Sequence, residues 1–324
     1  MAEVQQLLPH ERINFNLRPA KRIERKLVAE ALSCIYRYDT PRRFGYVGMG
    51  SYYFSDFVLF HRLFGHDKMI SIESDVDHKS RFEFNKPFDC IEMAWGLTTE
   101  CLPTLQLLNE RPVICWLDYY DFLTDVIIGD VNTVLRRAKS GSAVLVTLKA
   151  KQLGATKLKE FRQKLSQDNR NLSEEKLLAE GAEGMAKFMT EVLTAAVEPT
   201  VVALNGGRKK EERLELRQIV KLMYQDGDPM VTIGWLLLNP AQAEKLDAEP
   251  SALDAPGIGL SADEMREIRA PVLTFREIAH LRSMLPNGHA TSNFAEKAAH
   301  LPEEDANLFA EFYRYFPSFA DVEE

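Results

Sequence analysis

The chain has 324 residues and a formal net charge of −8 at pH 7, with 45% hydrophobic and 27% charged residues. This composition is ordinary for a globular protein, and the length is ample for a full α/β core. The negative charge argues against non-specific binding of nucleic acid over the whole surface.

Other compositional features exclude several classes of protein. No run approaches the roughly 18 apolar residues of a transmembrane helix, and residues 1–19 lack the apolar core of a signal peptide. The four cysteines form no C-x-x-C pair, so neither a zinc site nor a disulfide framework is expected. We therefore expect a cytoplasmic protein without a membrane partner and assign no residue as a metal ligand.

Residues 1–18 are expected to form an irregular arm. From Pro19 to about Tyr38, apolar residues recur at the spacing of an amphipathic helix, and Pro19 suits its first turn. Basic residues gather in and after this segment, namely Arg18, Lys21, Arg22, Arg25, Lys26, Arg42 and Arg43. We interpret them as a solvated helix face, and contact with nucleic acid through this patch is left open.

Residues 44–73 read as a strand, a glycine turn, a buried helix and a second strand. Gly48 and Gly50 frame the turn together with Ser51, residues 53–64 form the helix, and Gly65 ends it. Glu73 follows the second strand, about 23 residues after Gly50, within the range expected for a nucleoside-binding βαβ unit. Glycines there allow close approach of a ligand, and the acid can accept hydrogen bonds from ribose hydroxyls. A structural turn with a surface glutamate is the alternative interpretation.

Three further strands are expected at residues 90–94, 113–117 and 143–148, with helices between them. Short apolar strands that alternate with helices predict a mostly parallel sheet covered on both faces. Ligands bind such sheets at the carboxyl ends of the strands. The residues at these ends are Gly48, Gly50, Glu73, Trp95, Gly96 and Asp118. Their convergence predicts one binding site.

The character of the chain changes after residue 150. Residues 151–224 read as a helical insertion and a return helix, and residues 230–238 and 265–270 read as late strands. Thr274 and Glu277 form a capping box for a C-terminal helix. The expected division is an arm (1–18), a Rossmann-like cofactor-binding core (19–150), the helical segment (151–224), terminal strands of the core sheet (225–270) and a C-terminal helical extension (271–324).

A glycine turn after the first strand and an acid after the second resemble the class I S-adenosylmethionine-dependent methyltransferases. The two late strands resemble that family's terminal antiparallel hairpin. The segments YVGMGSYYFSDF, MISIE, RFEFNKPF and WLDYYD are also similar to a bacterial group described as O-methyltransferases. The resemblance implies a Rossmann-like doubly wound sheet and S-adenosylmethionine as cofactor, with Gly48, Gly50 and Ser51 at its methionine part and Glu73 on its ribose. It implies that Trp95 and Gly96 border its adenine.

Two positions depart from the family pattern. The acid that usually lies two residues before the first glycine is Tyr46 here, and the third glycine is Tyr52. The departure leaves three alternatives: weaker binding of the cofactor, Asp56 or Asp118 as the partner of its ammonium group, or a different nucleoside ligand. The same departure supports an alternative, a non-catalytic binding or assembly protein on a degenerate scaffold, with a protein partner bound through its helical extensions.

The residues after the fourth strand are the candidates for catalysis. Asp118 and Asp121 can act as a base or hold a metal ion, and Tyr119 can contact a planar acceptor. Asp118 could instead simply cap the next helix. The acceptor is unidentified. A nicotinamide-dependent oxidoreductase is a further alternative, which the missing third glycine fits less well.

Overall fold

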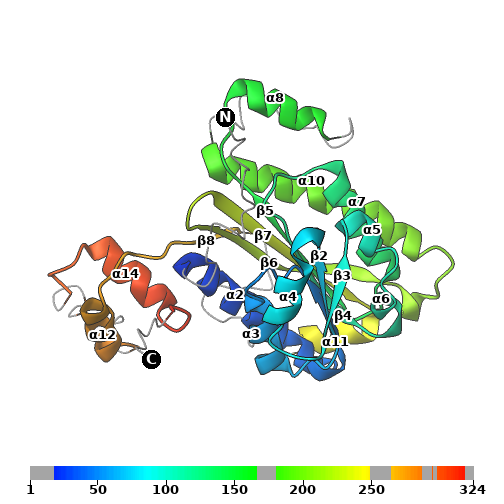
Figure 1. The fold of residues 1–324 in the computed structure, drawn as a ribbon, viewed down its shortest axis with the longest axis horizontal. Coiled ribbons are helices and arrows are strands. Elements are labelled where there is room, and N and C mark those ends of the chain that lie inside the picture. The colour runs from blue at the N-terminus through cyan, green and yellow to red at the C-terminus, as the bar shows by residue number, and fades with distance from the viewer. Residues whose placement is uncertain (1–17, 166–179, 249–263, 287–293, 295–297, 318–324) are drawn as a thin grey trace.

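The computed structural model describes residues 18–165, 180–248, 264–286, 294 and 298–317, and it contains an eight-stranded sheet between helices (Figure 1). The order across the sheet is β3-β2-β1-β4-β5-β7-β6-β8. The strands are β1 (Gly45–Gly48), β2 (Met69–Glu73), β3 (Ile91–Trp95), β4 (Val113–Asp118), β5 (Ala143–Lys149), β6 (Glu215–Gln225), β7 (Pro229–Leu238) and β8 (Arg266–Ile268). The arm was expected at residues 1–18, of which residues 1–17 lie outside the described residues, as do residues 166–179.

The helices connect and cover these strands. The α-helices are α2 (Pro19–Leu32), α3 (Ser55–Phe64), α4 (Lys79–Asn85), α5 (Thr98–Cys101), α6 (Leu107–Glu110), α7 (Asp125–Arg137), α8 (Ala155–Gln163), α10 (Gly181–Leu204), α11 (Pro240–Asp247), α12 (Phe275–Met284) and α14 (Glu303–Phe312). Short 3₁₀ helices are η2 (Ser33–Arg37), η3 (Pro41–Arg43), η4 (Val76–His78) and η6 (Lys210–Glu212). In Figure 1, α12 and α14 lie beyond β8, at the end of the molecule opposite to α6.

The pairing of the strands confirms the predicted fold class. The pairs β3–β2, β2–β1, β1–β4 and β4–β5 are parallel, whereas β7 is antiparallel to both β5 and β6. The sheet is therefore mostly parallel and Rossmann-like, with an antiparallel terminal hairpin. Because the carboxyl ends of β1, β2, β3 and β4 share one edge, the residues that follow them meet there.

The position of the hairpin differs from the prediction. The segment up to residue 224 was expected to be helical, but Glu215–Gln225 forms β6 and pairs with β7. A register shift between Gln218 and Val220 marks a bulge, which places the neighbouring Ile219 and Val220 in the same apolar cluster. The bulge breaks the alternation that would have indicated a strand. The expected edge strand at 265–270 exists as β8, but it pairs in parallel with β6.

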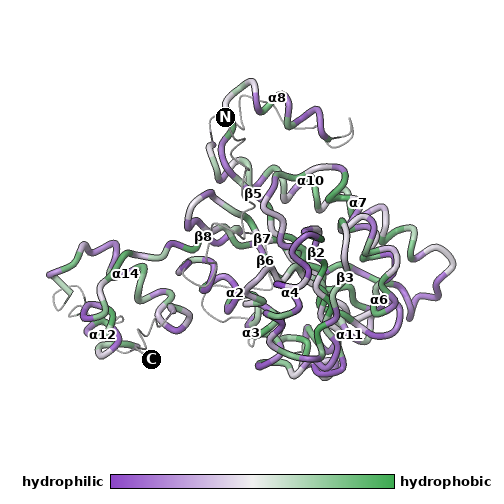
Figure 2. The backbone as a smooth tube through the Cα atoms, viewed as in Figure 1, coloured by the Kyte–Doolittle hydropathy of each residue, from purple (hydrophilic) through white to green (hydrophobic). Residues whose placement is uncertain are grey.

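Apolar side chains alternate between the two faces of the sheet. In β4, Ile114 and Trp116 join the cluster that includes α2 and α3, while Val113, Cys115 and Leu117 join the cluster that includes α7 and α10. Hydrophobic stretches accordingly concentrate in the strands and the inner helices (Figure 2).

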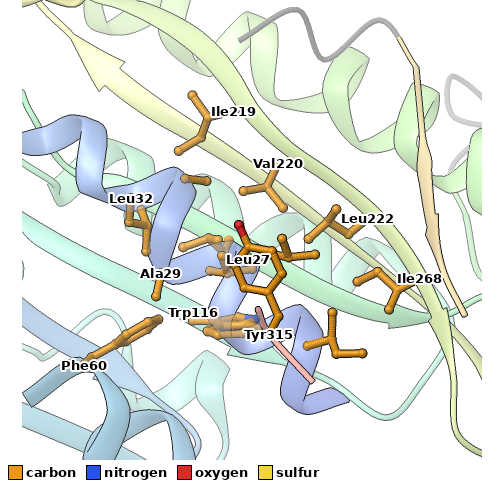
Figure 3. Packing of buried hydrophobic residues seen from close by; sticks show 14 of the residues in the cluster. Leu27, Ala29, Leu32, Phe60, Trp116, Ile219, Val220, Leu222, Ile268 and Tyr315 are labelled. Carbon is orange, nitrogen blue, oxygen red and sulfur yellow. The ribbon is translucent and has the colours of Figure 1, made fainter. Parts of the chain in front are cut away.

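Helix α2 is an integral part of the core. Leu27 and Leu32 are fully buried, and they belong to the same cluster as Leu222 of β6 and Trp116 of β4 (Figure 3). The carboxylate of Asp226, after β6, accepts hydrogen bonds from the first backbone N–H groups of α2, those of Ala20 at 3.0 Å and Lys21 at 2.7 Å. These hydrogen bonds satisfy backbone N–H groups that have no partner within the helix. They therefore fix the start of α2 beside the end of β6.

Several local predictions are confirmed. Gly65 ends α3 in a left-handed conformation with φ of 68°, and Thr274 and Glu277 form the capping box of α12. The helical segment expected between the third and fourth strands is divided into α5 and α6. The segment boundaries expected at residues 150 and 270 stay a prediction.

Candidate functional site

A cavity of about 390 Å³ lies at the carboxyl ends of the parallel strands. The candidate residues that line it are Gly50, Ser51, Glu73, Gly96, Asp118 and Tyr119. A larger hollow of about 920 Å³ lies at the C-terminal helices, between Leu285 and Tyr315. No candidate residue lines that hollow, so we place the functional site at the strand ends.

The glycine turn after β1 runs directly beside this cavity. The backbone N–H of Gly50 donates to Ser71 Oγ at 2.9 Å, and that of Ser51 donates to Glu73 Oε1 at 2.8 Å. A Cβ atom on Gly50 would lie 2.5 Å from the ring of Phe54, a buried side chain. Glycine is therefore required, because the turn passes between the core and the cavity. Ser51 itself has a positive φ of 50°.

Glu73 is buried at the end of β2, with 9% of its surface exposed. Its Oε1 accepts hydrogen bonds from the Ser51 N–H and, at 3.1 Å, from Ser71 Oγ. Burial outweighs these bonds and raises the pKa of the Glu73 carboxyl to about 7. Within the described part of the chain, its Oε2 receives no hydrogen bond. A buried carboxylate with one open oxygen is suited to accept a ligand hydroxyl.

An acidic residue contacts Tyr46, which stands where the family pattern has an acid. Tyr46 is fully buried, and its hydroxyl donates a hydrogen bond to Asp56 Oδ2 in the first turn of α3. Asp56 lines the cavity, and burial raises the pKa of its carboxyl. The tyrosine therefore fixes the orientation of an acid that the sequence pattern does not place there. Asp56 was one of the two substitutes that the sequence indicated.

Asp118, at the end of β4, is paired with a residue of the N-terminal helix. The ammonium group of Lys21 lies 2.9 Å from Asp118 and 3.4 Å from Glu24, and its side chain is 4% exposed. Burial disfavours the charged amine, but the carboxylates of Asp118 and Glu24 outweigh it and raise the pKa of Lys21. Lys21 therefore stays protonated beside Asp118.

Hydrogen bonds continue from this ion pair into the sheet. Glu24 accepts a bond from Thr232 Oγ1 at 2.6 Å, and Thr232 in turn contacts Thr147 Oγ1 at 2.8 Å. Trp116 Nε1 donates to Thr147 at 2.9 Å. These hydrogen bonds link α2 to β4, β5 and β7. Glu24 connects them to Lys21, the partner of Asp118.

The other candidates near Asp118 have different surroundings. The hydroxyl of Tyr119 donates to the buried carboxylate of Asp130 at 2.7 Å, which also accepts from Thr98 at 2.5 Å. Tyr119 therefore lines the cavity while its hydroxyl is held by Asp130 of α7. Asp121 is exposed, accepts from the N–H of Phe122 at 2.8 Å and does not line the cavity. The catalytic roles assigned to these residues stay predictions.

Two further candidates are not at the cavity, and one alternative is excluded. Gly48 faces the Tyr46 hydroxyl, where a Cβ atom would lie 2.8 Å away, and Trp95 packs against Phe82. Asp118 does not cap α7, because the cap residue is Thr124. Among the described residues, no three His, Cys, Asp or Glu side chains are grouped so as to hold a metal ion.

The sequence interpretation missed the part of the site that comes from α2, β6 and β7. Arg18, Lys21, Arg25, Tyr224 and Met230 also line the cavity. Reading the basic residues of α2 as a solvated face was wrong for Lys21 and Arg25, which are 3% and 8% exposed. One signal was present: these two lie four residues apart, on the helical stripe that continues through the buried Val28 and Leu32.

Comparisons with known proteins identify the family. The chain belongs to the family described as "Putative O-methyltransferase", whose model matches residues 13–324. No curated protein sequence matches the chain. In the described part of the chain, no helix is both long and apolar enough to cross a membrane.

The chain is also similar to solved structures. One is Trm1 from Pyrococcus horikoshii with S-adenosyl-L-methionine, at a TM-score of 0.44 and 12% identity over 70% of this chain and 57% of that chain. A second is the N-methyltransferase NodS from Bradyrhizobium japonicum in complex with S-adenosyl-L-homocysteine, at 0.38 and 12% over 70% and 90%. A third is an O-methyltransferase from Bacillus cereus, at 0.34 and 10% over 67% and 90%. These scores are low, so the family match carries the identification.

Proposed function

We propose that the protein transfers a methyl group from S-adenosylmethionine to an oxygen atom of its acceptor. The observation that carries this proposal is the convergence of the Gly50–Ser51 turn and Glu73 on one cavity at the strand ends. Membership of the O-methyltransferase family supports it. Low-scoring structural neighbours that contain this cofactor or its product agree with the proposal but do not carry it.

The residues around the cavity fit an adenosine cofactor. Glu73 Oε2 is an open acceptor for a ribose hydroxyl, and Gly50 lets the backbone run close to the ligand. Gly96 and Leu97, after β3, line the cavity where the adenine would lie. When bound, the cofactor supplies a methyl group on a positively charged sulfur atom.

The protein's part in methyl transfer is to hold the acceptor in line and to manage its proton. Positioning of two reactants can contribute on the order of 7–11 kcal/mol. We assign Asp118 to accept the hydroxyl proton, because it is the carboxylate of β4 that lines the cavity. Lys21, which stays protonated beside it, stabilises negative charge on the acceptor oxygen. Tyr119 and Tyr120 provide ring surfaces for a planar acceptor.

Two alternatives are less consistent with the structure. A nicotinamide-dependent oxidoreductase of the Rossmann type has parallel strands in the order 3-2-1-4-5-6, whereas here the antiparallel β7 lies between β5 and β6. The argument for a degenerate scaffold was the missing acid at Tyr46. This argument is weakened by Asp56, whose carboxylate accepts a hydrogen bond from the Tyr46 hydroxyl and lines the cavity.

Transfer of labelled methyl tests the proposal. The purified protein is incubated with methyl-labelled S-adenosylmethionine and the small-molecule fraction of a cell extract. We expect a labelled product that Asp118→Asn forms about 10²- to 10⁴-fold more slowly, the usual effect of losing a general base. Cofactor binding by this variant should be nearly unchanged. If Asp118→Asn is as active as the wild type, Asp118 is not the base. If the protein binds S-adenosylmethionine but forms no labelled product, methyl transfer is contradicted.

Other expectations from the sequence stay predictions. They are a cytoplasmic location, a protein partner bound through the helical extensions, and a nucleic-acid contact through basic residues of the N-terminal segment. The burial of Lys21 and Arg25 removes two residues from that basic patch.

A further inference from the structure

A second hollow, which we call the basic groove, lies between α2 and α3. It has a volume of about 380 Å³ and is lined by Arg22, Arg25 and Lys26 of α2, by Tyr53 and by three uncharged residues of α3. Among the residues that the structure describes, no aspartate or glutamate lines it. Arg25 also lines the cavity at the strand ends, so the two spaces adjoin at this residue.

Arg25 carries a buried positive charge that is not neutralised within the described part of the chain. It is 8% exposed, and its Nε and Nη1 find no hydrogen-bond partner there. A buried guanidinium without partners is costly, and a bound anion would offset that cost.

The neighbouring cations of the groove increase its positive charge. The ammonium group of Lys26 donates to the backbone carbonyl of Tyr315 at 2.9 Å, which is a neutral acceptor. Burial and the positive charges of Arg22 and Arg282 lower the pKa of Lys26, and burial and the charge of Arg25 lower the pKa of Arg22. These cations are therefore close enough to repel one another, and an anion between them would relieve the repulsion.

Acidic and basic residues come from different parts of the cavity at the strand ends. Asp56 and Glu73 belong to the βαβ unit that the cofactor would occupy, whereas Arg18, Lys21 and Arg25 all come from α2. The cofactor itself carries a positively charged sulfur atom. The α2 side of the cavity instead favours a ligand of negative charge.

The spacing along α2 relates this charge to the proposed base. Lys21 lies 2.9 Å from Asp118, and Arg25 follows Lys21 by four residues. Four residues of an α-helix span roughly 6 Å along its axis. A ligand of small-molecule size can therefore reach from Asp118 to Arg25, and a groove of about 380 Å³ has room for one of its groups.

We propose that the methyl acceptor is a small anion whose acidic group, a carboxylate or a phosphate, binds Arg25 at the basic groove while its hydroxyl lies at Asp118. This inference rests on the proposed function and names the class of its acceptor. The planar fork of arginine matches both acidic groups with two parallel hydrogen bonds.

The acidic group takes no part in the reaction. The hydroxyl proton passes to Asp118 and the acceptor oxygen forms a bond to the methyl carbon, while the electron pair of the broken methyl–sulfur bond stays on sulfur. The methylated product therefore keeps the negative charge of the acceptor.

The charge of the product tests the proposal first. The protein is incubated with methyl-labelled S-adenosylmethionine and the small-molecule fraction of a cell extract, and the mixture is passed over an anion exchanger at about pH 8, where carboxylates and phosphates are ionised. Unreacted cofactor is a cation and passes through, whereas we expect the labelled product to be retained. Methylation of the acidic group itself would remove its charge, so a labelled product that is not retained overturns the proposal.

Two treatments of the retained product distinguish a carboxylate from a phosphate. Coupling to methylamine with a carbodiimide neutralises a carboxylate, and alkaline phosphatase removes a phosphate monoester. Loss of retention after the first treatment identifies a carboxylate acceptor, and loss after the second identifies a phosphate acceptor. Either result supports the proposal.

Substitutions of Arg25 test where the acidic group binds. The variants are compared on dilutions of the unlabelled extract fraction that elutes from the anion exchanger and supports labelling. Arg25→Met should raise the KM for the acceptor about 10- to 100-fold and change kcat by less than about threefold, because the contact is made equally before and during methyl transfer. Arg25→Lys should lose less affinity, because it keeps the charge but loses the fork.

Arg22→Met separates the basic groove from the cofactor site. Arg22 lines the groove but not the cavity at the strand ends, so its loss should raise the KM for the acceptor about two- to fivefold. Calorimetric titration should show the affinity for S-adenosylhomocysteine unchanged within about twofold. Arg62→Met is the matched control, because Arg62 is an exposed residue of α3 that lines neither space. It should keep the KM of the wild type.

The outcomes separate this inference from the proposed function. If a labelled product forms but is not retained, the acceptor is not an anion and methyl transfer stands. If the product is retained but Arg25→Met and Arg22→Met have the KM of Arg62→Met, the basic groove does not bind the acceptor and the inference is wrong. If the wild type binds S-adenosylmethionine but forms no labelled product, the proposed function fails and this inference fails with it.

Discussion

The ammonium group of Lys21, on the N-terminal helix, lies 2.9 Å from the carboxylate of Asp118 at the end of β4. Both residues line the cavity, so α2 forms part of its wall. Glu24, one helical turn further on, shares the same ammonium group. Helix α2, which precedes the sheet in sequence, thus fixes the position of the Asp118 carboxylate through Lys21.

Replacement of Lys21 by methionine should destabilise the protein. It would leave the carboxylates of Glu24 and Asp118 together without their cation, and breaking a buried pair by removing one partner typically costs 3–5 kcal/mol. Because the Asp118 side chain is 29% exposed, we expect a decrease of about 3 kcal/mol in the free energy of unfolding, at the low end of that range.

Urea unfolding measures this decrease. Lys187→Met is the control, because Lys187 forms a solvent-exposed pair with Glu183 on α10, and its stability should match that of the wild type. Equal stability of Lys21→Met and the control would show that the buried pair does not hold α2 in place.

Glu73 should make the stability of the free protein depend on pH. Its pKa in the folded protein is about 7, above its usual value, so the folded state holds the proton more tightly than the unfolded state. The resulting stability is present below the usual pKa and is lost as the pH rises through about 7. Glu73→Gln should therefore be more stable than the wild type at about pH 8, by about 1–3 kcal/mol, and similar to it at low pH.

Thermal unfolding of both proteins at about pH 4.5 and pH 8 measures the difference. A parallel change of the two melting temperatures between these pH values would contradict burial of an ionisable carboxyl at this position.

Cofactor affinity should depend on pH in the opposite direction. The ionised Glu73 accepts from ribose hydroxyls better than the neutral acid does, so binding releases the proton of the free protein. Below about pH 7 the affinity for S-adenosylhomocysteine should fall by up to about tenfold per pH unit, and above it the affinity should level off. Titrations between about pH 5.5 and 8.5 measure this curve. Glu73→Gln should bind weakly at every pH, and a wild-type affinity that does not change with pH would rule out proton release from Glu73.

Gly50→Ala should damage the site through packing. The added methyl would lie 2.5 Å from the Phe54 ring and 3.0 Å from Ser71 Oγ, which accepts the Gly50 N–H. Overpacking of this kind costs about 1–3 kcal/mol and should displace the turn from Glu73. Gly129→Ala is the control, because this exposed helical glycine has no neighbour within 4 Å and alanine should stabilise α7 by about 0.5–1 kcal/mol. If both substitutions have the same effect on stability and ligand binding, the turn does not need its glycine.

The strand ends could be predicted from the sequence because their signals are local. The glycine turn, the short apolar strands and Glu73 each follow from residues within one βαβ unit. The strand β6 could not be predicted in this way, because its bulge at Gln218 and Val220 interrupts the alternation and a charged segment precedes it.

The role of α2 depends on contacts that periodicity does not reveal. In sequence, Lys21 and Arg25 resemble surface residues of an amphipathic helix. In the folded protein both line the cavity, and Lys21 is paired with Asp118. The same applies to Tyr46, which is a departure in the motif but a hydrogen-bond donor to Asp56 in the folded protein.

Titration of S-adenosylhomocysteine into the wild type and into Glu73→Ala tests the central claim most directly. An adenosine ligand held through its ribose by Glu73 should bind the wild type and should lose about 10- to 100-fold in affinity in the variant, with the fold retained. Absence of binding to the wild type, or equal affinity for both proteins, would contradict the account.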